Sequence, residues 1–324
     1  MGLRGSLLGN RQARGPRRPL RALVTGGSGV VGKALVAHLL SAGDHVKVLT
    51  RSEGAASTVA DLGAEAVSGD ILDYPSCLSA ASGADVVYHV AGLNDMCPAA
   101  AESLHEVNVA GTRTVARAAA TAGVKRLVYT SSAAAHEPHP TAYGLSKLRG
   151  ERVAFAEAGV SLEVVAVSPT SVQGPGRSDG TARLLLAILD GRLRFLPDTS
   201  VSVIDIGDCA KAHRLAAIGG RPGANYAISG ATIVTSQIGE LRRAVGLAPC
   251  RMRRLPRWWF HALAPVVAFR PQLAGIRLCP DLLRAVLVPH AVDGSAAANE
   301  LGFEYTPIAE TLQNLLEWAR SPTP

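Results

Sequence analysis

The chain has 324 residues, 48% of them hydrophobic, so it can bury a large core as one long unit or as two fused ones. The net charge is +7, but six arginines without an acidic partner lie in residues 1–21 and leave +1 for residues 22–324, which argues against a nucleic-acid-binding protein. Five scattered cysteines and nine unclustered histidines predict neither a disulfide framework nor a metal site.

Residues 1–20 form a basic stretch rich in glycine and arginine, which predicts a disordered tail. The pair Arg17-Arg18 resembles a twin-arginine export signal, but Leu20 to Thr25 is already needed as the first strand. Because no apolar stretch precedes a cleavage site, we expect a cytoplasmic protein.

A glycine turn joins the first predicted strand, Arg21 to Thr25, to a helix over Lys33 to Leu40. Its glycines fit two registers, 26, 29 and 32 or 27, 29 and 32, and either places backbone amides and a helix N-terminus where a pyrophosphate would bind. The residues expected to contact a dinucleotide in this turn are Gly26, Ser28, Gly29, Val30, Val31 and Gly32.

Further short apolar runs alternate with helical stretches along the chain. They span His45 to Arg51, Glu65 to Asp70, Asp85 to Ala91, Arg126 to Ser131 and Leu162 to Pro169. Strands that alternate with helices indicate an α/β protein with a doubly wound parallel sheet of the Rossmann type.

The end of the second strand bears on the choice of cofactor. An NAD-binding fingerprint has an acidic residue there, about twenty residues beyond the glycines, whereas this chain has Thr50 and Arg51, and Asp44 lies before the strand. Because an arginine can pair with a 2′-phosphate, we favour NADP(H), with NAD(H) as the alternative if Arg51 is only a solvated strand end.

Tyr143 and Lys147 follow a strand that ends in Ser131-Ser132. At spacing i and i+4 on a helix the phenol and the ammonium share one face, so the positive charge is expected to lower the phenol pKa toward neutral pH. Ser132 can hydrogen-bond a substrate oxygen at that phenol. Such a Tyr–Lys spacing is common on helix surfaces, and its place after this strand is what favours catalysis.

These motifs, in this order, resemble the extended short-chain dehydrogenase/reductases, also called the NAD-dependent epimerase/dehydratase superfamily, over roughly residues 21 to 320. The resemblance implies that Ser132 orients a carbonyl group, Tyr143 is the acid/base, Lys147 also binds ribose, and Asn108 supports the site. It further implies cofactor contacts from Asp70, Ile71, Ala91, Gly92, Pro169 and Thr170. A homodimer is what the family resemblance suggests.

Beyond Pro169 the pattern changes. We assign residues 21–170 to the nucleotide-binding domain and 171–324 mainly to a smaller substrate domain, with about 201–229 returning to the sheet, beginning with a strand over Val201 to Ile206. Position alone suggests five further substrate contacts, namely Asn94, Asp95, Met96, Val172 and Gln173.

The stretch from Leu255 to Phe269 contains Trp258 and Trp259 and follows several arginines. It is too short to span a bilayer, and Pro265 interrupts it. Packing in the core or as a pocket lid is the favoured interpretation, and a surface helix that touches anionic lipid is the alternative. The segment is similar to one in the branch of dihydroflavonol 4-reductase, 3β-hydroxysteroid dehydrogenase and hopanoid-associated reductases, which favours an apolar ring or polyketide-like substrate.

Three functions compete. A reductase or dehydrogenase is favoured, and a nucleotide-sugar epimerase with the same triad stays open. A dehydratase is disfavoured because Ala133-Ala134 follow Ser132 where an acidic pair would be needed. A cofactor-binding module without activity is less favoured because Tyr143 and Lys147 are both present. The loop from Ser132 to Tyr143 is short, which predicts a more open cleft or an unusual substrate.

Overall fold

The computed structural model describes residues 18–96, 101–260, 272–273, 276–277, 287–289 and 291–321. Most of the expected basic tail, residues 1–17, lies outside the described residues, as do residues 261–269 of the aromatic segment.

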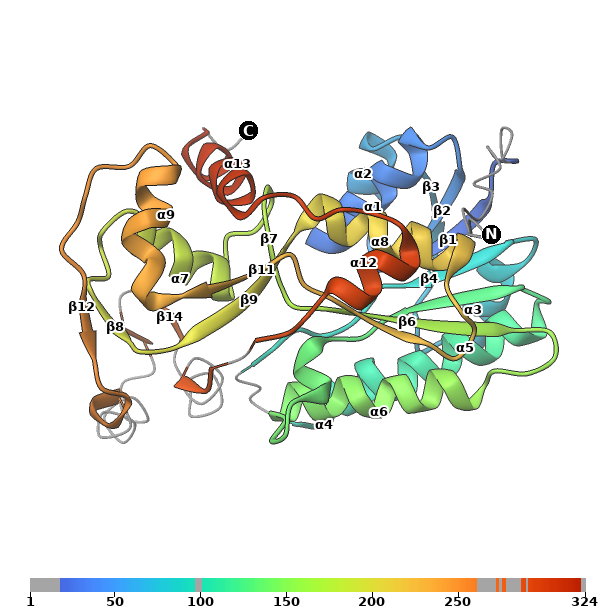
Figure 1. The fold of residues 1–324 in the computed structure, drawn as a ribbon. Helices are drawn as coiled ribbons and strands as arrows, with labels where there is room; N and C mark the ends of the chain where they lie inside the picture. Colours follow the sequence, from blue (N-terminus) through green and yellow to red (C-terminus); the bar gives the residue numbers. More distant parts are fainter. Residues whose placement is uncertain are drawn as a thin grey trace, which may run out of the picture.

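A seven-stranded parallel sheet forms the larger part of the molecule, which confirms the predicted fold class (Figure 1). Its strands are β1 (Arg21–Thr25), β2 (His45–Thr50), β3 (Glu65–Ser68), β4 (Val86–His89), β5 (Arg126–Thr130), β6 (Glu163–Pro169) and β10 (Asn225–Ile228). The order is β10-β6-β5-β4-β1-β2-β3, and every neighbouring pair is parallel. The order of the strands therefore changes direction between β1 and β4, which is the switch point of the sheet. Sheets of this kind bind ligands outside the carboxyl ends of the strands at the switch point.

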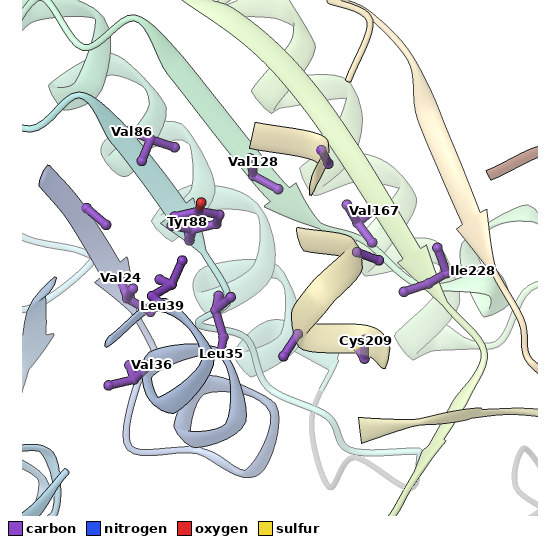
Figure 2. Close-up of a cluster of buried hydrophobic side chains, with 14 of the residues drawn as sticks. Val24, Leu35, Val36, Leu39, Val86, Tyr88, Val128, Val167, Cys209 and Ile228 are labelled. Carbon is purple, nitrogen blue, oxygen red and sulfur yellow. The ribbon is translucent and has the colours of Figure 1, made fainter. Parts of the chain in front are cut away.

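Helices cover both faces of this sheet, because its strands are apolar on both sides. On one face the main core joins the sheet to α1 (Val30–Ser41), α2 (Glu53–Asp61), α8 (Ile206–Gly219) and α12 (Ser295–Leu301). Figure 2 shows this core, with Leu35 and Leu39 of α1 beside Val24 and Tyr88 of the sheet. All four of these side chains are buried.

A second core lies on the opposite face of the sheet. It is built from α3 (Tyr74–Ala81), α5 (Gly111–Thr121) and α6 (Ala142–Ala156) packed on Leu127 and Val164. Between β4 and α5 lie α4 (Ala101–His105) and a turn of π-helix, η1 (Glu106–Ala110). A π-helical turn inside a longer helix often marks a functional position.

The strand predicted over residues 201–206 forms as β9 (Ser200–Asp205), but it does not return to the large sheet. It lies in a separate three-stranded sheet between β7 (Ser171–Gln173) and β11 (Ala231–Val234). The return is made by α8, which packs on α1, and by β10, which pairs with β6. An apolar strand pattern predicts a strand but not its partner, because both sheets bury similar residues.

The three-stranded sheet belongs to a third core, away from the large sheet (Figure 1). Its other elements are α7 (Gly180–Leu189), α9 (Ile238–Ala244), α13 (Ile308–Arg320) and β8 (Phe195–Pro197), which pairs in parallel with β12 (Arg253–Leu255). A short antiparallel pair, β13 (Gln272–Leu273) and β14 (Ile276–Arg277), follows in the chain. The described residues include no helix long and apolar enough to cross a bilayer.

Candidate active site

The glycine turn after β1 has no room for larger side chains in either of its predicted registers. Gly26 has φ of +74°, and a Cβ there would lie 2.6 Å from the Ala91 backbone nitrogen. A Cβ at Gly32 would lie 2.0 Å from the Gly26 carbonyl oxygen, and one at Gly27 would lie 2.5 Å from Val48 Cγ1. The turn therefore packs tightly against both β4 and β2.

The N-terminus of α1 lies at this turn, at the switch point of the sheet. Its N-cap is Gly29, which supplies no side-chain acceptor, and its first turn contains no acidic residue. The amides of Val30, Val31 and Gly32 are thus left for an anion to bind, and the helix dipole favours negative charge there. Together with the glycine cradle, these residues fit the pyrophosphate of a dinucleotide.

Arg51, at the end of β2, lies beside Asp70, which follows β3. Arg51 Nη1 is 3.8 Å from Asp70 Oδ2, and the Arg51 side chain is 70% exposed. Asp44 has a structural role, because its buried carboxylate accepts hydrogen bonds from Arg214 at 2.8 Å and from the Leu20 amide at 3.0 Å. The structure thus leaves Arg51 and Asp70 as the charged pair at this strand edge.

Two further predicted cofactor contacts have clear structural roles. Ile71 is buried against the start of α5, where a Cβ on Gly111 would come within 2.7 Å of Ile71 Cδ1. The Ala91 amide donates to Thr25 Oγ1 at 3.3 Å, so the segment after β4 is tied to β1.

Tyr143 and Lys147 lie in the first two turns of α6, on the predicted helix. Thr141 caps that helix by accepting a hydrogen bond from the Gly144 amide at 3.2 Å. The Ser132 side chain lies close enough to the Tyr143 phenol to lower its pKa. A Cβ at Gly92 would lie 3.4 Å from Lys147 Nζ, so the segment after β4 faces this lysine.

Asn108 is fully buried in the π-helical turn and acts as a clamp. Its Oδ1 accepts from the Leu93 amide at 2.7 Å, and its Nδ2 donates to the Leu93 carbonyl at 3.0 Å and to Ser146 Oγ at 2.9 Å. Ser146 in turn donates to the Tyr143 carbonyl at 2.7 Å. Asn108 therefore positions both the loop after β4 and the helix turn that carries Tyr143.

Burial shifts the pKa of both members of the pair. Burial raises the pKa of Tyr143, and the groups that oppose this rise are the Ser132 hydroxyl and then the Arg177 charge, rather than Lys147. Lys147 itself is buried, which lowers its pKa to about 7 against the opposing charge of Glu151. Burial thus reduces the charge that Lys147 brings to the phenol at neutral pH, and the tuning of Tyr143 by Lys147 stays a prediction.

A buried histidine that sequence reasoning missed links β1 to the clamp. His89 Nε2 lies 3.0 Å from Thr112 Oγ1, which donates to the Asn108 carbonyl, and His89 Nδ1 lies 2.7 Å from Thr25 Oγ1. Because the Thr112 proton goes to Asn108, the ring proton belongs on Nε2. Burial, followed by the Lys147 charge, lowers the His89 pKa to about 3, so the ring stays neutral. In the sequence, the signal for this role was a histidine within an otherwise apolar strand.

The short loop before Tyr143 folds as a 3₁₀ turn, η2 (Ala133–His136), capped by Ser132, which accepts from the Ala134 amide at 3.2 Å. The loop is held close to α6, since a Cβ at Gly144 would lie 2.3 Å from the Ala134 carbonyl oxygen. His136 Nε2 lies 3.0 Å from buried Glu151, which also accepts from Ser131 at 2.5 Å.

A cavity of 580 Å³ lies along this loop. Its lining is largely apolar and includes Ala133, the residue after Ser132, together with four polar residues. The lining residues are Ala133, His136, Glu137, Pro138, Ser168, Asn225, Ala227, Pro289, Ala291 and Val292.

The remaining predicted contacts lie in three places. Pro169 ends β6, and the amide of the next residue, Thr170, donates to the Ile228 carbonyl at 3.0 Å. Val172 and Gln173 of β7 are buried, and their contact with substrate stays a prediction. The loop from Asn94 to Met96 follows the clamped Leu93. Within the described ranges, no group of three histidine, cysteine or acidic side chains is placed to bind a metal ion.

Comparisons with known proteins agree with this geometry. A 36% identical relative, the ceramide reductase of Caulobacter vibrioides, aligns over 58% of this chain and 57% of its own length. The putative dihydroflavonol 4-reductase of Synechocystis is 29% identical over 91% of this chain and 93% of that protein. The solved structure of MoeE5 in complex with UDP-glucose and NAD is 25% identical, with a TM-score of 0.70, and covers 93% of this chain and 98% of MoeE5.

The sequence profile of one family matches residues 22–229, which is more than half of the chain and includes the glycine turn, Ser132, Tyr143 and Lys147. On this evidence the chain belongs to the NAD dependent epimerase/dehydratase family.

Proposed function

We propose that the protein is an NAD(P)-dependent oxidoreductase that interconverts a ketone and a secondary alcohol on an apolar small molecule. The observation that carries this proposal is that Ser132 acts on the Tyr143 phenol while Lys147, one turn further along α6, faces Gly92 in the segment after β4.

The residues divide the chemistry as follows in the direction of reduction. Bound NAD(P)H supplies a hydride to the carbonyl carbon. Tyr143 donates its phenolic proton to the carbonyl oxygen as negative charge develops there, and the Ser132 hydroxyl donates a hydrogen bond to the same oxygen. Tyr143 then regains a proton from solvent. In the oxidation direction the phenolate accepts the alcohol proton.

Lys147 lies next to this proton transfer and is not the group that protonates the carbonyl oxygen. With a pKa of about 7, it is protonated in part of the molecules at neutral pH and can exchange a proton at Nζ. Its closeness to Gly92, which by the family resemblance contacts the cofactor, supports the proposed contact of Lys147 with the cofactor ribose.

Two observations support an apolar substrate. The cavity along the loop that begins at Ala133 is lined mainly by alanine, proline and valine side chains, and 580 Å³ is within the range of small-molecule pockets. The relatives named as ceramide reductase and dihydroflavonol 4-reductase are, by those names, enzymes of large and mostly apolar molecules.

A nucleotide-sugar epimerase is the second candidate, because MoeE5 binds UDP-glucose with a similar fold. It would use the same Tyr143 for transient oxidation of a sugar carbon, with no net change in the cofactor.

NADP(H) is favoured over NAD(H). Arg51 is exposed at the end of β2, where it can meet a 2′-phosphate, and Asp44 is occupied by Arg214. The Asp70 carboxylate beside Arg51 moderates this preference, because it already pairs with the guanidinium.

The test is to incubate the pure protein with NADPH and separate panels of apolar ketones and nucleotide sugars, and to follow NADPH absorbance and the sugar products. The account predicts net NADPH loss with at least one ketone. Sugar conversion without NADPH loss would instead support the epimerase, and the Tyr143→Phe variant in parallel identifies reactions that depend on this site.

A further inference from the structure

An exposed group of aromatic side chains lies far from the catalytic residues. The rings of Trp258 and Trp259 stack with centroids 4.9 Å apart, and these side chains are 61% and 49% exposed. Phe195 on β8 is 53% exposed. Among the described residues, these three are the exposed phenylalanine and tryptophan side chains. Of the two favoured placements, core or pocket lid, this exposure excludes the core for Trp258 and Trp259.

Arginines surround these rings. Strand pairing places Arg253 opposite Phe195, and residues 190–198 and 251–259 together contain six arginines against two aspartates, a net charge of +4. The other residues of 22–324 then carry −3, since that range carries +1 in total. The arginines are Arg192, Arg194, Arg251, Arg253, Arg254 and Arg257, and all are exposed. We call them, with Phe195, Trp258 and Trp259, the aromatic–arginine surface.

This surface occupies one end of the molecule. Figure 1 shows β8 and β12 at the end opposite the seven-stranded sheet. Asp198 is the acidic residue within it, where it lies 3.6 Å from Arg254 and accepts from Arg257 through its carbonyl oxygen at 2.9 Å. These two contacts of Asp198 do not neutralise the other four arginines. One of the four, Arg192, pairs with Asp190 at the edge of the surface.

The combination of exposed tryptophan with arginine is typical of contact with a bilayer surface. Tryptophan rings favour the interface between headgroups and acyl chains, and guanidinium groups bind phosphates. We propose that the aromatic–arginine surface docks the protein on bilayers of anionic phospholipid. The contact is peripheral, because no helix in the described residues could cross a bilayer.

Docking on a bilayer is separate from the proposed oxidoreductase activity and can be measured without a substrate. An apolar ketone partitions into a bilayer, so a docked enzyme would meet it there at a higher local concentration.

The test measures co-sedimentation of the full chain with vesicles of phosphatidylcholine alone and of phosphatidylcholine mixed equally with phosphatidylglycerol. We expect binding to the anionic vesicles that weakens with added salt. Trp258→Ser with Trp259→Ser should reduce this binding at least about tenfold, since both rings lose their interfacial contact. Arg253→Gln with Arg257→Gln should reduce it about thirtyfold, since each basic residue near an anionic surface contributes about fivefold.

The matched control is Arg113→Gln with Arg117→Gln, which removes two exposed arginines from α5 and should leave vesicle binding unchanged. NADPH affinity in solution, equal in all variants, shows that each is folded. All these proteins keep the arginines of residues 1–21. If vesicle binding survives both double substitutions, that segment is responsible for the binding, and this result would overturn the proposal. Equal binding to neutral vesicles, or a solution dimer that the tryptophan substitutions abolish, would also overturn it.

Discussion

Lys147 Nζ lies 4.5 Å from the centre of the Tyr129 ring, and the Tyr129 hydroxyl donates to the Lys147 carbonyl oxygen at 3.2 Å. The lysine is thus positioned by an aromatic face in a buried site, with Glu151 as the charge that favours its protonated form. The desolvation that burial imposes on the ammonium outweighs these favourable contacts, so the Lys147 pKa falls to about 7.

This burial predicts an unusual stability profile. Between about pH 7 and the normal lysine pKa of 10.5, the unfolded chain binds more protons at Lys147 than the folded chain does, so this residue makes the free energy of unfolding rise with pH. Lys147→Met should therefore stabilise the fold by about 1–3 kcal/mol near pH 7 and by less near pH 10, while abolishing turnover. Urea unfolding at both pH values measures this.

Lys47→Met is the control, because Lys47 is an exposed lysine of β2. A Lys147→Met variant that is less stable than wild type near pH 7, or a stability difference that does not change with pH, would contradict the account.

Arg177 provides a second prediction, on pH and rate. Its charge opposes the rise in the Tyr143 pKa that burial causes, and its buried Nε has no hydrogen-bond partner. Arg177→Gln should therefore raise the phenol pKa further, and the ascending limb of the pH profile for alcohol oxidation should move to higher pH. The same substitution at exposed Arg183 on α7 should leave the profile in place. An unchanged limb in Arg177→Gln would show that the guanidinium does not act on Tyr143.

The sequence was sufficient for the parts of the site that depend on local pattern. Glycines at 26, 27, 29 and 32 follow a strand and precede a helix, so their turn could be predicted from the sequence. The structure leaves little room for a side chain at the glycines of either register. The spacing of Tyr143 and Lys147 likewise predicts one helix face, and the strand pattern predicts the parallel sheet.

The rest depends on contacts between distant segments. His89 and Arg177 acquire their roles from residues far away in the chain, and nothing in their neighbours indicates this. The Lys147 pKa depends on how deeply the helix packs, which spacing does not reveal. Packing in the core or as a pocket lid is the placement that aromatic residues usually favour, but Trp258 and Trp259 follow the short, arginine-rich strand β12 and are exposed.

Cofactor preference gives a third prediction. Arg51→Asp should weaken NADPH binding by about tenfold or more, because two carboxylates, the new one and Asp70, would then face the 2′-phosphate. NADH affinity should change less or improve. Fluorescence titration with both nucleotides measures this, with Arg152→Asp on the exposed face of α6 as the charge-matched control. Equal NADPH affinity in wild type and Arg51→Asp would remove the argument for NADP(H).

We propose that Tyr143 transfers the proton in a reaction that needs a nicotinamide cofactor. The most direct measurement compares wild type and Tyr143→Phe for NADPH oxidation with a ketone that the wild type reduces, alongside NADPH binding in the same samples. The account predicts turnover reduced by at least about a hundredfold with NADPH affinity nearly unchanged, because the phenolic proton serves only the chemical step. Turnover equal to that of the wild type would contradict it.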